Sequence, residues 1–283
     1  MRVKPKGLAT VVTASLVVAG LILGALAFVV VRRHPAAPVS PNRGARTRPP
    51  PSAPNSPSSL TPRQALGPAC LIHEVHGDFD GDGLEDGAFT WMAEPAEGCP
   101  SDPPFGPFLL TVFRAGNGER LELQMTDRCD GQNCGYLTKA DLNGDGKSEL
   151  VAVAWTGAAD DYYRVFGLVD GRLIALPVAR PGAKGYPAGA PIELDVGGTA
   201  LIQSYVTCET SDAWGGPILL AHGFSAHVDQ QGRERWTHTE TAFRFDGRAF
   251  VVLYQDQPEA FPLSYDPSRD ASLRERACWP ALP

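Results

Sequence analysis

The first 68 residues of this 283-residue chain contain no aspartate or glutamate, although they hold nine lysines and arginines. All 32 acidic residues therefore lie in residues 69–283, together with sixteen basic ones, which leaves that part with a net charge of about −16. An acidic domain repels phosphate backbones, so this excess argues against nucleic-acid binding.

Long amphipathic helix patterns are also missing from residues 69–283, where no apolar stripe persists at the 3.6-residue period. Short runs of β-branched and aromatic residues recur instead, separated by Gly, Asp and Pro turns. The length suits one domain. We therefore predict a single all-β domain over residues 69–283.

One long stretch near the start lacks charge altogether. Residues 8–31 are 24 residues without Asp, Glu, Lys or Arg, with basic residues on both sides. As a helix they would reach about 36 Å, enough to cross a hydrocarbon core of about 30 Å. We predict a cytoplasmic stub and a transmembrane signal anchor over residues 1–31. The apolar run continues past Ala25-Leu26-Ala27, which favours an uncleaved anchor, and cleavage near Ala27 followed by secretion is the alternative.

Residues 32–68 have almost no apolar side chains but contain ten prolines. Such a segment cannot bury a core, so we expect a disordered linker that could extend on the order of 100 Å. The following domain is expected to fold without it.

Two Asp/Gly-rich segments dominate the rest of the chain. They run from Asp78 to Asp86 and from Asp141 to Glu149. The oxygen-bearing side chains fall at loop positions 1, 3, 5 and 9, which are Asp78, Asp80, Asp82 and Asp86 in the first loop and Asp141, Asn143, Asp145 and Glu149 in the second. Position 6 is Gly83 or Gly146, as a tight loop requires, and the backbone carbonyl at position 7 would come from Leu84 or Lys147. An all-oxygen shell of this kind suits Ca²⁺ better than Mg²⁺.

An EF-hand begins in the same way but ends in a glutamate at position 12 and lies between helices. Position 12 is Phe89 or Ala152 here, and each loop is followed by a β-prone run. We therefore expect strands to carry the loops. The first loop has four carboxylates and the second three, so the first is expected to contribute more to calcium binding.

The two segments resemble the FG-GAP or VCBS repeat, a calcium-binding blade unit of β-propellers such as those of integrin α-chains. The resemblance covers each loop and the strand after it. It implies a propeller-like stack of about three blades, with a third, degenerate copy beginning at Leu194-Asp195-Val196-Gly197-Gly198 that lacks the loop carboxylates. Both faces of the apolar strand 150–155 are expected to be covered.

The six cysteines include no closely spaced CxxC pairs of the kind that bind metals as thiolates. Six cysteines allow fifteen pairings. We predict Cys129–Cys134 as a local bridge, Cys70–Cys99 around the first loop, and Cys208–Cys278 at the C-terminal end. Disulfides and calcium loops both suit an oxidising compartment outside the cell, which places the domain outside the membrane.

Catalytic patterns are weak. His73 and His76 flank a glutamate, but on a strand they point to opposite faces and cannot both bind one metal without a bend. Residues 223–227 are one residue short of a nucleophile elbow and are expected to form a loop. Trp214 and Trp236 are candidates for surface ligand contact, with core packing as the alternative.

The function predicted from these observations is a non-catalytic, membrane-tethered, calcium-binding β module that binds a protein or glycan at the cell surface, with self-association as a further option. A calcium-dependent hydrolase or lyase of the cell envelope is the alternative.

Overall fold

The structure is a computed structural model, and it describes residues 66, 69–93, 98–99, 106–129, 133–256, 259–262, 267 and 270–279. The chain divides into two units, and these residues all belong to the second, Pro54–Pro283. The predicted anchor over residues 1–31 and nearly all of the predicted linker lie outside the described residues. In the described ranges, no helix has the length and apolar character needed to cross a membrane.

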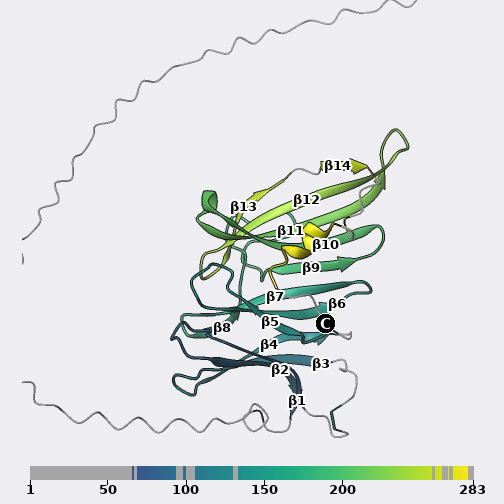
Figure 1. Cartoon of the computed structure of the whole chain (residues 1–283). Helices are drawn as coiled ribbons and strands as arrows, with labels where there is room; N and C mark the ends of the chain where they lie inside the picture. The colour runs from purple at the N-terminus through teal and green to yellow at the C-terminus, as the bar shows by residue number, and fades with distance from the viewer. Residues whose placement is uncertain are drawn as a thin grey trace, which may run out of the picture. The chain divides into compact units, whose positions relative to one another are not determined.

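The first sheet has four antiparallel strands, which pair in chain order (Figure 1). They are β1 (Ala69–Gly77), β2 (Asp86–Ala93), β3 (Gly106–Phe113) and β4 (Arg120–Cys129). The β3–β4 connection contains a turn at residues 116–118, in which Gly118 has a φ of 69°. A Cβ on Gly116 would overlap Asp82 Oδ2, so this turn lies directly against the first Asp/Gly loop.

The second sheet has ten strands, in the order β13-β12-β11-β10-β9-β7-β6-β5, with β8 paired to β7 and β14 to β12. Its strands are β5 (Leu137–Ala140), β6 (Glu149–Thr156), β7 (Asp160–Val169), β8 (Arg172–Ala175), β9 (Glu193–Gly198), β10 (Ile202–Ser211), β11 (Gly216–Val228), β12 (Glu234–Phe245), β13 (Phe250–Gln255) and β14 (Glu259–Pro262). A 3₁₀ turn, η1 (Asp212–Trp214), and a short helix, α2 (Ala271–Glu275), accompany them. The all-β prediction is confirmed.

The predicted repeat is visible in the strand pairing. Strands β1 to β4 form one antiparallel meander and β5 to β8 another, and in each the Asp/Gly loop joins the first strand to the second. The Asp170-Gly171 turn between β7 and β8 has positive φ at both residues, as a two-residue hairpin requires. Neither sheet closes among the described strands, so the arrangement does not show a propeller.

The third segment differs from what the sequence suggested. Residues 194–198 lie in strand β9, which pairs with β7 and β10 instead of forming a loop between two strands. Residues 223–227 lie inside β11, so the prediction of a loop there was wrong, because the long β11–β12 ladder includes them in its register. Trp214 is 38% exposed, whereas Trp236 is buried against Phe224.

Strand β6 lies at the centre of the core. Its Leu150 and Ala152 pack in one apolar cluster with Leu110 of β3, and its Val151 and Val153 pack in another with Phe243 of β12. The prediction that both faces of this strand are covered is therefore confirmed. Because strand side chains alternate, one short strand joins the two clusters.

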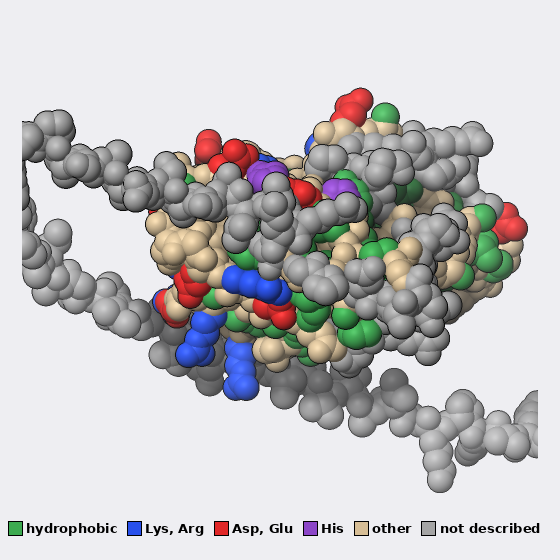
Figure 2. Space-filling model, turned by 90° about the horizontal axis from the view of Figure 1, so that it is seen from below, with side chains coloured by type: hydrophobic (Ala, Val, Ile, Leu, Met, Phe, Trp, Pro, Cys, Tyr) green, Lys and Arg blue, Asp and Glu red, His purple; other side chains and the backbone are tan. Residues whose placement is uncertain are grey.

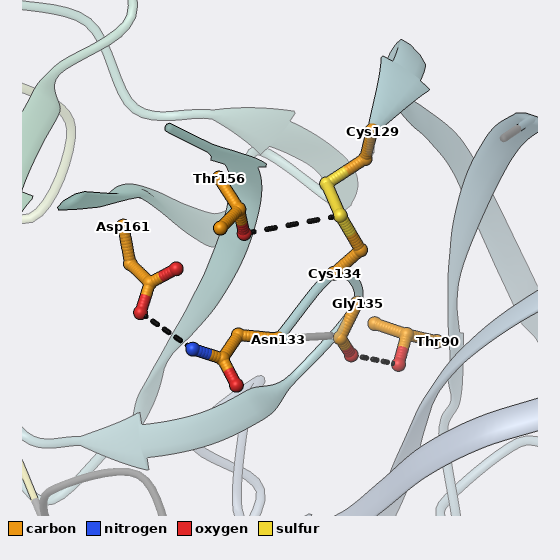
Figure 3. The surroundings of a disulfide bond; sticks show 7 residues. All are labelled: Thr90, Cys129, Asn133, Cys134, Gly135, Thr156 and Asp161. Carbon is orange, nitrogen blue, oxygen red and sulfur yellow. Dashed lines mark hydrogen bonds between the residues drawn. A yellow bond between two sulfur atoms is a disulfide. The ribbon is translucent and has the colours of Figure 1, made fainter. Parts of the chain in front are cut away.

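All three predicted disulfides are present: Cys70–Cys99, Cys129–Cys134 and Cys208–Cys278. The second bridge connects β4 to the start of the next meander (Figure 3). Beside it the Gly135 carbonyl accepts a hydrogen bond from Thr90, and Asn133 Nδ2 donates to Asp161 Oδ2 at 2.8 Å. This corner therefore joins both sheets through covalent and hydrogen bonds.

The N-terminal edge of the packed region precedes residue 69. Leu66 is buried in a cluster with Phe89 and Trp91 of β2, on the face of the first sheet away from β6.

Arg120 lies 5.6 Å from the Trp91 ring centroid and its Nη2 is 2.5 Å from Glu122 Oε2. Seen from below, the molecule displays Lys and Arg side chains beside Asp and Glu side chains (Figure 2).

Candidate cation-binding loops

The first loop is organised by carboxylates that accept backbone N–H groups. Asp78 Oδ1 accepts from Gly81 N at 2.6 Å, and its Oδ2 accepts from Gly83 N at 2.9 Å. Asp80 Oδ1 then accepts from Asp82 N, and Asp82 Oδ1 accepts from Leu84 N. Gly81 and Gly83 have φ values of 83° and 81°, a conformation that favours glycine. Hydrogen bonds from backbone N–H groups to the alternating carboxylates therefore fix the conformation of the loop.

The second loop repeats this pattern. Asp141 accepts from Gly144 N at 2.7 Å and Gly146 N at 3.0 Å, Asn143 Oδ1 accepts from Asp145 N, and Asp145 Oδ1 accepts from Lys147 N. The glycines at positions 4 and 6 again have positive φ. Sequence reasoning identified the glycine at position 6 but missed the one at position 4, which the Asp-x-Asx-Gly spacing of both loops could have indicated.

The position-9 carboxylates turn back into each loop and are buried. Asp86 is fully buried, and it accepts from Phe79 N at 3.1 Å and from Ala115 N at 2.8 Å. Glu149 is 5% exposed and accepts from Leu142 N at 2.9 Å. Both carboxylates are thus held by the N–H of loop position 2.

Burial raises the pKa of both position-9 carboxyl groups. For Asp86, desolvation raises the pKa, the two backbone hydrogen bonds oppose that rise, and the charges of Asp80 and Asp82 add to it. For Glu149, desolvation together with the charges of Asp145 and Asp141 raises the pKa to about 7. A bound cation would offset this unfavourable burial of negative charge.

Each loop also has its own basic side chain. Arg114 donates through Nε to Asp80 Oδ2 at 2.6 Å, and Asp80 is almost fully buried. Lys147 Nζ lies 3.8 Å from Asp145 Oδ2. Arg114 neutralises one of the four carboxylates of the first loop, which reduces the difference between the loops that counting charges predicts.

The two loops lie side by side. Ser148 N in the second loop donates to the Asp78 carbonyl of the first at 2.9 Å. A Cβ on Gly81 would lie 2.7 Å from Lys147 Cδ, so the stem of this lysine lies directly against the first loop. The two loops are therefore in direct contact, and a substitution in one can affect the other.

The donor set of the first loop fits a hard cation. One oxygen from each of Asp78, Asp80 and Asp86 lies within 4.8 Å of the others. Only oxygen donors converge there, as Ca²⁺ or Mg²⁺ prefers. The three acids of the second loop do not form such a group, so the structure brings the predicted ligands together more closely in the first loop. Leu84 and Lys147 occupy position 7 of the first and the second loop respectively, and the contribution of their backbone carbonyls to cation binding stays a prediction.

His73 and His76 of β1 have different partners. His73 packs its ring against Tyr136 at a centroid distance of 4.6 Å, whereas His76 Nε2 lies 2.7 Å from Glu74 Oε1.

A different group of metal-ligating side chains was missed by sequence reasoning. It comprises His222, His238 and Glu240 on β11 and β12. The hydrogen bonds from His222 and Tyr254 lower the pKa of Glu240 to about 2, although burial opposes this. The spacing of His238 and Glu240, two apart on a strand, was a signal that both lie on one face.

Comparison with known proteins finds no matching family model and no matching curated protein. Three solved structures are similar at a TM-score of 0.32: rhamnogalacturonan lyase YesW at 16% identity, a Bacillus licheniformis rhamnogalacturonan lyase at 15%, and the exotype rhamnogalacturonan lyase YesX at 14%. Each alignment covers 74% of this chain, and 36%, 36% and 35% of those proteins respectively. This chain therefore spans about a third of their length, and a likeness at this TM-score does not establish a shared fold.

Proposed function

We propose that the β domain is a non-catalytic, calcium-stabilised binding module of the FG-GAP/VCBS type, tethered outside the cell by the N-terminal anchor. The observation that carries the proposal is that the two loops share one hydrogen-bonding pattern, from the position-1 aspartate to the buried position-9 carboxylate. An ordinary solvated Asp/Gly turn has no need of a buried carboxylate at its end, because burial without a counter-charge costs free energy.

Calcium is the cation that this chemistry favours. The oxygen donors come from flexible loop side chains and a backbone carbonyl, and Ca²⁺ accepts six to eight oxygens in an adaptable shell. When bound, the ion would be held by the side chains at positions 1, 3, 5 and 9, and it would neutralise carboxylates that otherwise repel one another. Its role in this proposal is structural: it stiffens the connection between the first two strands of each meander.

The location outside the cell is supported by two features. Three disulfides suit an oxidising compartment, and loops with a small number of carboxylates suit the high calcium concentration found outside cells. A propeller-like stacking of blades and a protein or glycan ligand belong to the same proposal. The exposed Trp214 is a candidate for contact with that ligand.

Calorimetric titration of the chelator-treated protein with Ca²⁺ tests the proposal. Wild type is expected to bind calcium, with Asp82→Asn reducing the binding more than Asp145→Asn. Asp170→Asn is the matched control, because Asp170 also lies in an Asp-Gly turn but is outside both loops and forms an ion pair with Arg248 on the surface. Loss of binding in the control, or no binding by wild type, would contradict the proposal.

A ligand screen on the folded domain, with and without calcium, tests the binding role. Retention of a protein or glycan without its cleavage is expected. Cleavage of a glycan by the calcium-loaded protein would favour the alternative, a calcium-dependent hydrolase or lyase.

A further inference from the structure

The group formed by His222, His238 and Glu240 lies on the second sheet, away from the Asp/Gly loops. Strand pairing brings it together: His222 of β11 stands opposite Glu240 of β12, and His238 is two residues before Glu240 on the same strand. Residues two apart on a strand point to the same face, and a diagonal neighbour on the adjacent strand lies within side-chain reach. The antiparallel register therefore directs all three side chains to one place.

The donor atoms of the three residues lie close together around His222 Nδ1. His222 Nδ1 lies 3.2 Å from His238 Nε2 and 3.2 Å from Glu240 Oε2, and one atom from each residue lies within 4.8 Å of the others. Zinc binds imidazole nitrogen and carboxylate oxygen at about 2.0–2.2 Å in a tetrahedral arrangement, which places its ligand atoms roughly 3.3 Å apart. The two distances from His222 Nδ1 match that value.

The His222 ring has polar partners at both of its nitrogens. His222 Nδ1 faces both His238 Nε2 and Glu240 Oε2, and a single N–H cannot be aligned with both. Its other ring nitrogen, Nε2, is already paired with Thr207 Oγ1 at 2.9 Å. A divalent ion between the three donor atoms would accept a lone pair from each of them at once.

Surrounding contacts hold the ligands in place. Thr207 fixes the far side of the His222 ring, and the Tyr254 hydroxyl donates to Glu240 Oε1 at 2.6 Å, which leaves Oε2 for the ion. The His238 ring stacks on Phe224 at a centroid distance of 4.4 Å and an interplanar angle of 15°. Partners of this kind fix ring orientation and carboxylate geometry in known metal sites.

The ligands also differ in exposure. The His222 side chain is 4% exposed, whereas that of Glu240 is 18% exposed. The side of the group at Glu240 is therefore open to solvent, which provides an entry path for an ion and a position for a water ligand.

We propose that His222, His238 and Glu240 form a binding site for Zn²⁺, or a transition-metal ion of similar preference, with three protein ligands and a fourth position open to water. Two nitrogen donors distinguish it from the all-oxygen Asp/Gly loops, which suit calcium. The site is independent of the function proposed above.

Titration of the metal-free, untagged full chain with Zn²⁺, in competition with a chromophoric chelator, tests this proposal. One tight equivalent is expected for wild type, with the affinity reduced at least about tenfold in both His238→Gln and Glu240→Gln. His227→Gln is the matched control, because His227 lies on β11, as His222 does, and is hydrogen-bonded to Thr237 Oγ1 at the exposed end of the ladder, outside the three-residue group. The control is expected to bind Zn²⁺ as wild type does.

Two further measurements keep the outcome interpretable. Circular dichroism tests whether each variant is folded. If His238→Gln is unfolded, the more conservative Glu240→Gln is used as the ligand variant instead. Co²⁺ bound in place of Zn²⁺ is expected to give the visible absorption of a four-coordinate site, which Glu240→Gln should alter. The proposal is overturned if wild type binds no Zn²⁺, if both ligand variants bind as tightly as wild type, or if Asp82→Asn removes the binding instead.

Discussion

Glu149→Gln is the substitution for which the structure makes the sharpest prediction. Glu149 is buried, accepts one hydrogen bond from Leu142 N, and has its pKa raised to about 7 by desolvation and by the charges of Asp145 and Asp141. Glutamine has the same size and keeps an oxygen that can accept the Leu142 bond. The substitution therefore removes a buried charge while preserving the packing.

The magnitude follows from the shift in pKa. A rise from the ordinary value of 4.5 to about 7 corresponds to roughly 3 kcal/mol of unfavourable free energy in the ionised folded state, at about 1.36 kcal/mol per unit. A carboxyl group with a raised folded-state pKa destabilises the fold above its unfolded-state pKa, and the penalty grows until the pH reaches the folded value. Metal-free wild type should therefore lose stability between about pH 4.5 and 7, and Glu149→Gln should be more stable than wild type at pH 7 by up to that amount.

Asp86→Asn differs from Glu149→Gln because it removes a hydrogen-bond acceptor together with a buried charge, and these two changes oppose each other. Both oxygens of Asp86 accept backbone N–H groups, from Phe79 and Ala115. An asparagine has only one oxygen, so its amide nitrogen would face one of these donors and leave it without a partner. This unpaired donor costs about 1–3 kcal/mol, so we expect Asp86→Asn to gain less stability than Glu149→Gln does in the metal-free protein at pH 7.

Urea unfolding in the presence of a calcium chelator, at pH 4.5, 7 and 8, measures these effects. Glu85→Gln is the control, because Glu85 is an exposed neighbour of Asp86 and should leave stability within about 0.5 kcal/mol of wild type. The two stability curves of wild type and Glu149→Gln should converge at pH 4.5. A Glu149→Gln variant that is less stable than wild type at pH 7 without calcium would refute the reasoning.

Three other outcomes are expected. A fragment beginning at Pro54, which retains the buried Leu66, should show a cooperative melt, and an unfolded fragment under oxidising conditions would place the domain boundary elsewhere. Replacing the Cys208–Cys278 pair by alanine should destabilise the domain by about 4 kcal/mol, whereas replacing Cys129–Cys134 should cost about 2 kcal/mol, because the bridge that closes the larger loop restricts the unfolded chain more. Equal losses of stability in chemical denaturation would count against this. Asp195→Asn should raise the melting temperature at pH 7 but not near pH 4, because burial raises the pKa of Asp195 and its Oδ1 is buried without a hydrogen-bond partner. The same gain in melting temperature at both pH values would contradict this cause.

Local features of this protein were determined by the sequence alone. Carboxylates at alternate positions, followed by glycine, specify the Asp/Gly loops, because a side chain that bonds to a backbone N–H two residues ahead needs no distant partner. The strand after each loop and the Asp170-Gly171 hairpin are local in the same sense. The run of consecutive apolar residues in β6 predicted that both of its faces are covered, because successive side chains of a strand point to opposite faces.

Non-local contacts were decided only by the tertiary structure. Arg114 binds Asp80 from 34 residues away, and Lys147 crosses Gly81 from the second loop. His222 meets Glu240 because the β11–β12 register places them opposite each other. Strand pairing depends on turn geometry and on which face each strand buries, so a one-residue change in register would turn these side chains to the other face. For that reason the sequence indicated the carboxylates of the Asp/Gly loops, whereas the basic residues beside them and the histidine group emerged only from the folded chain.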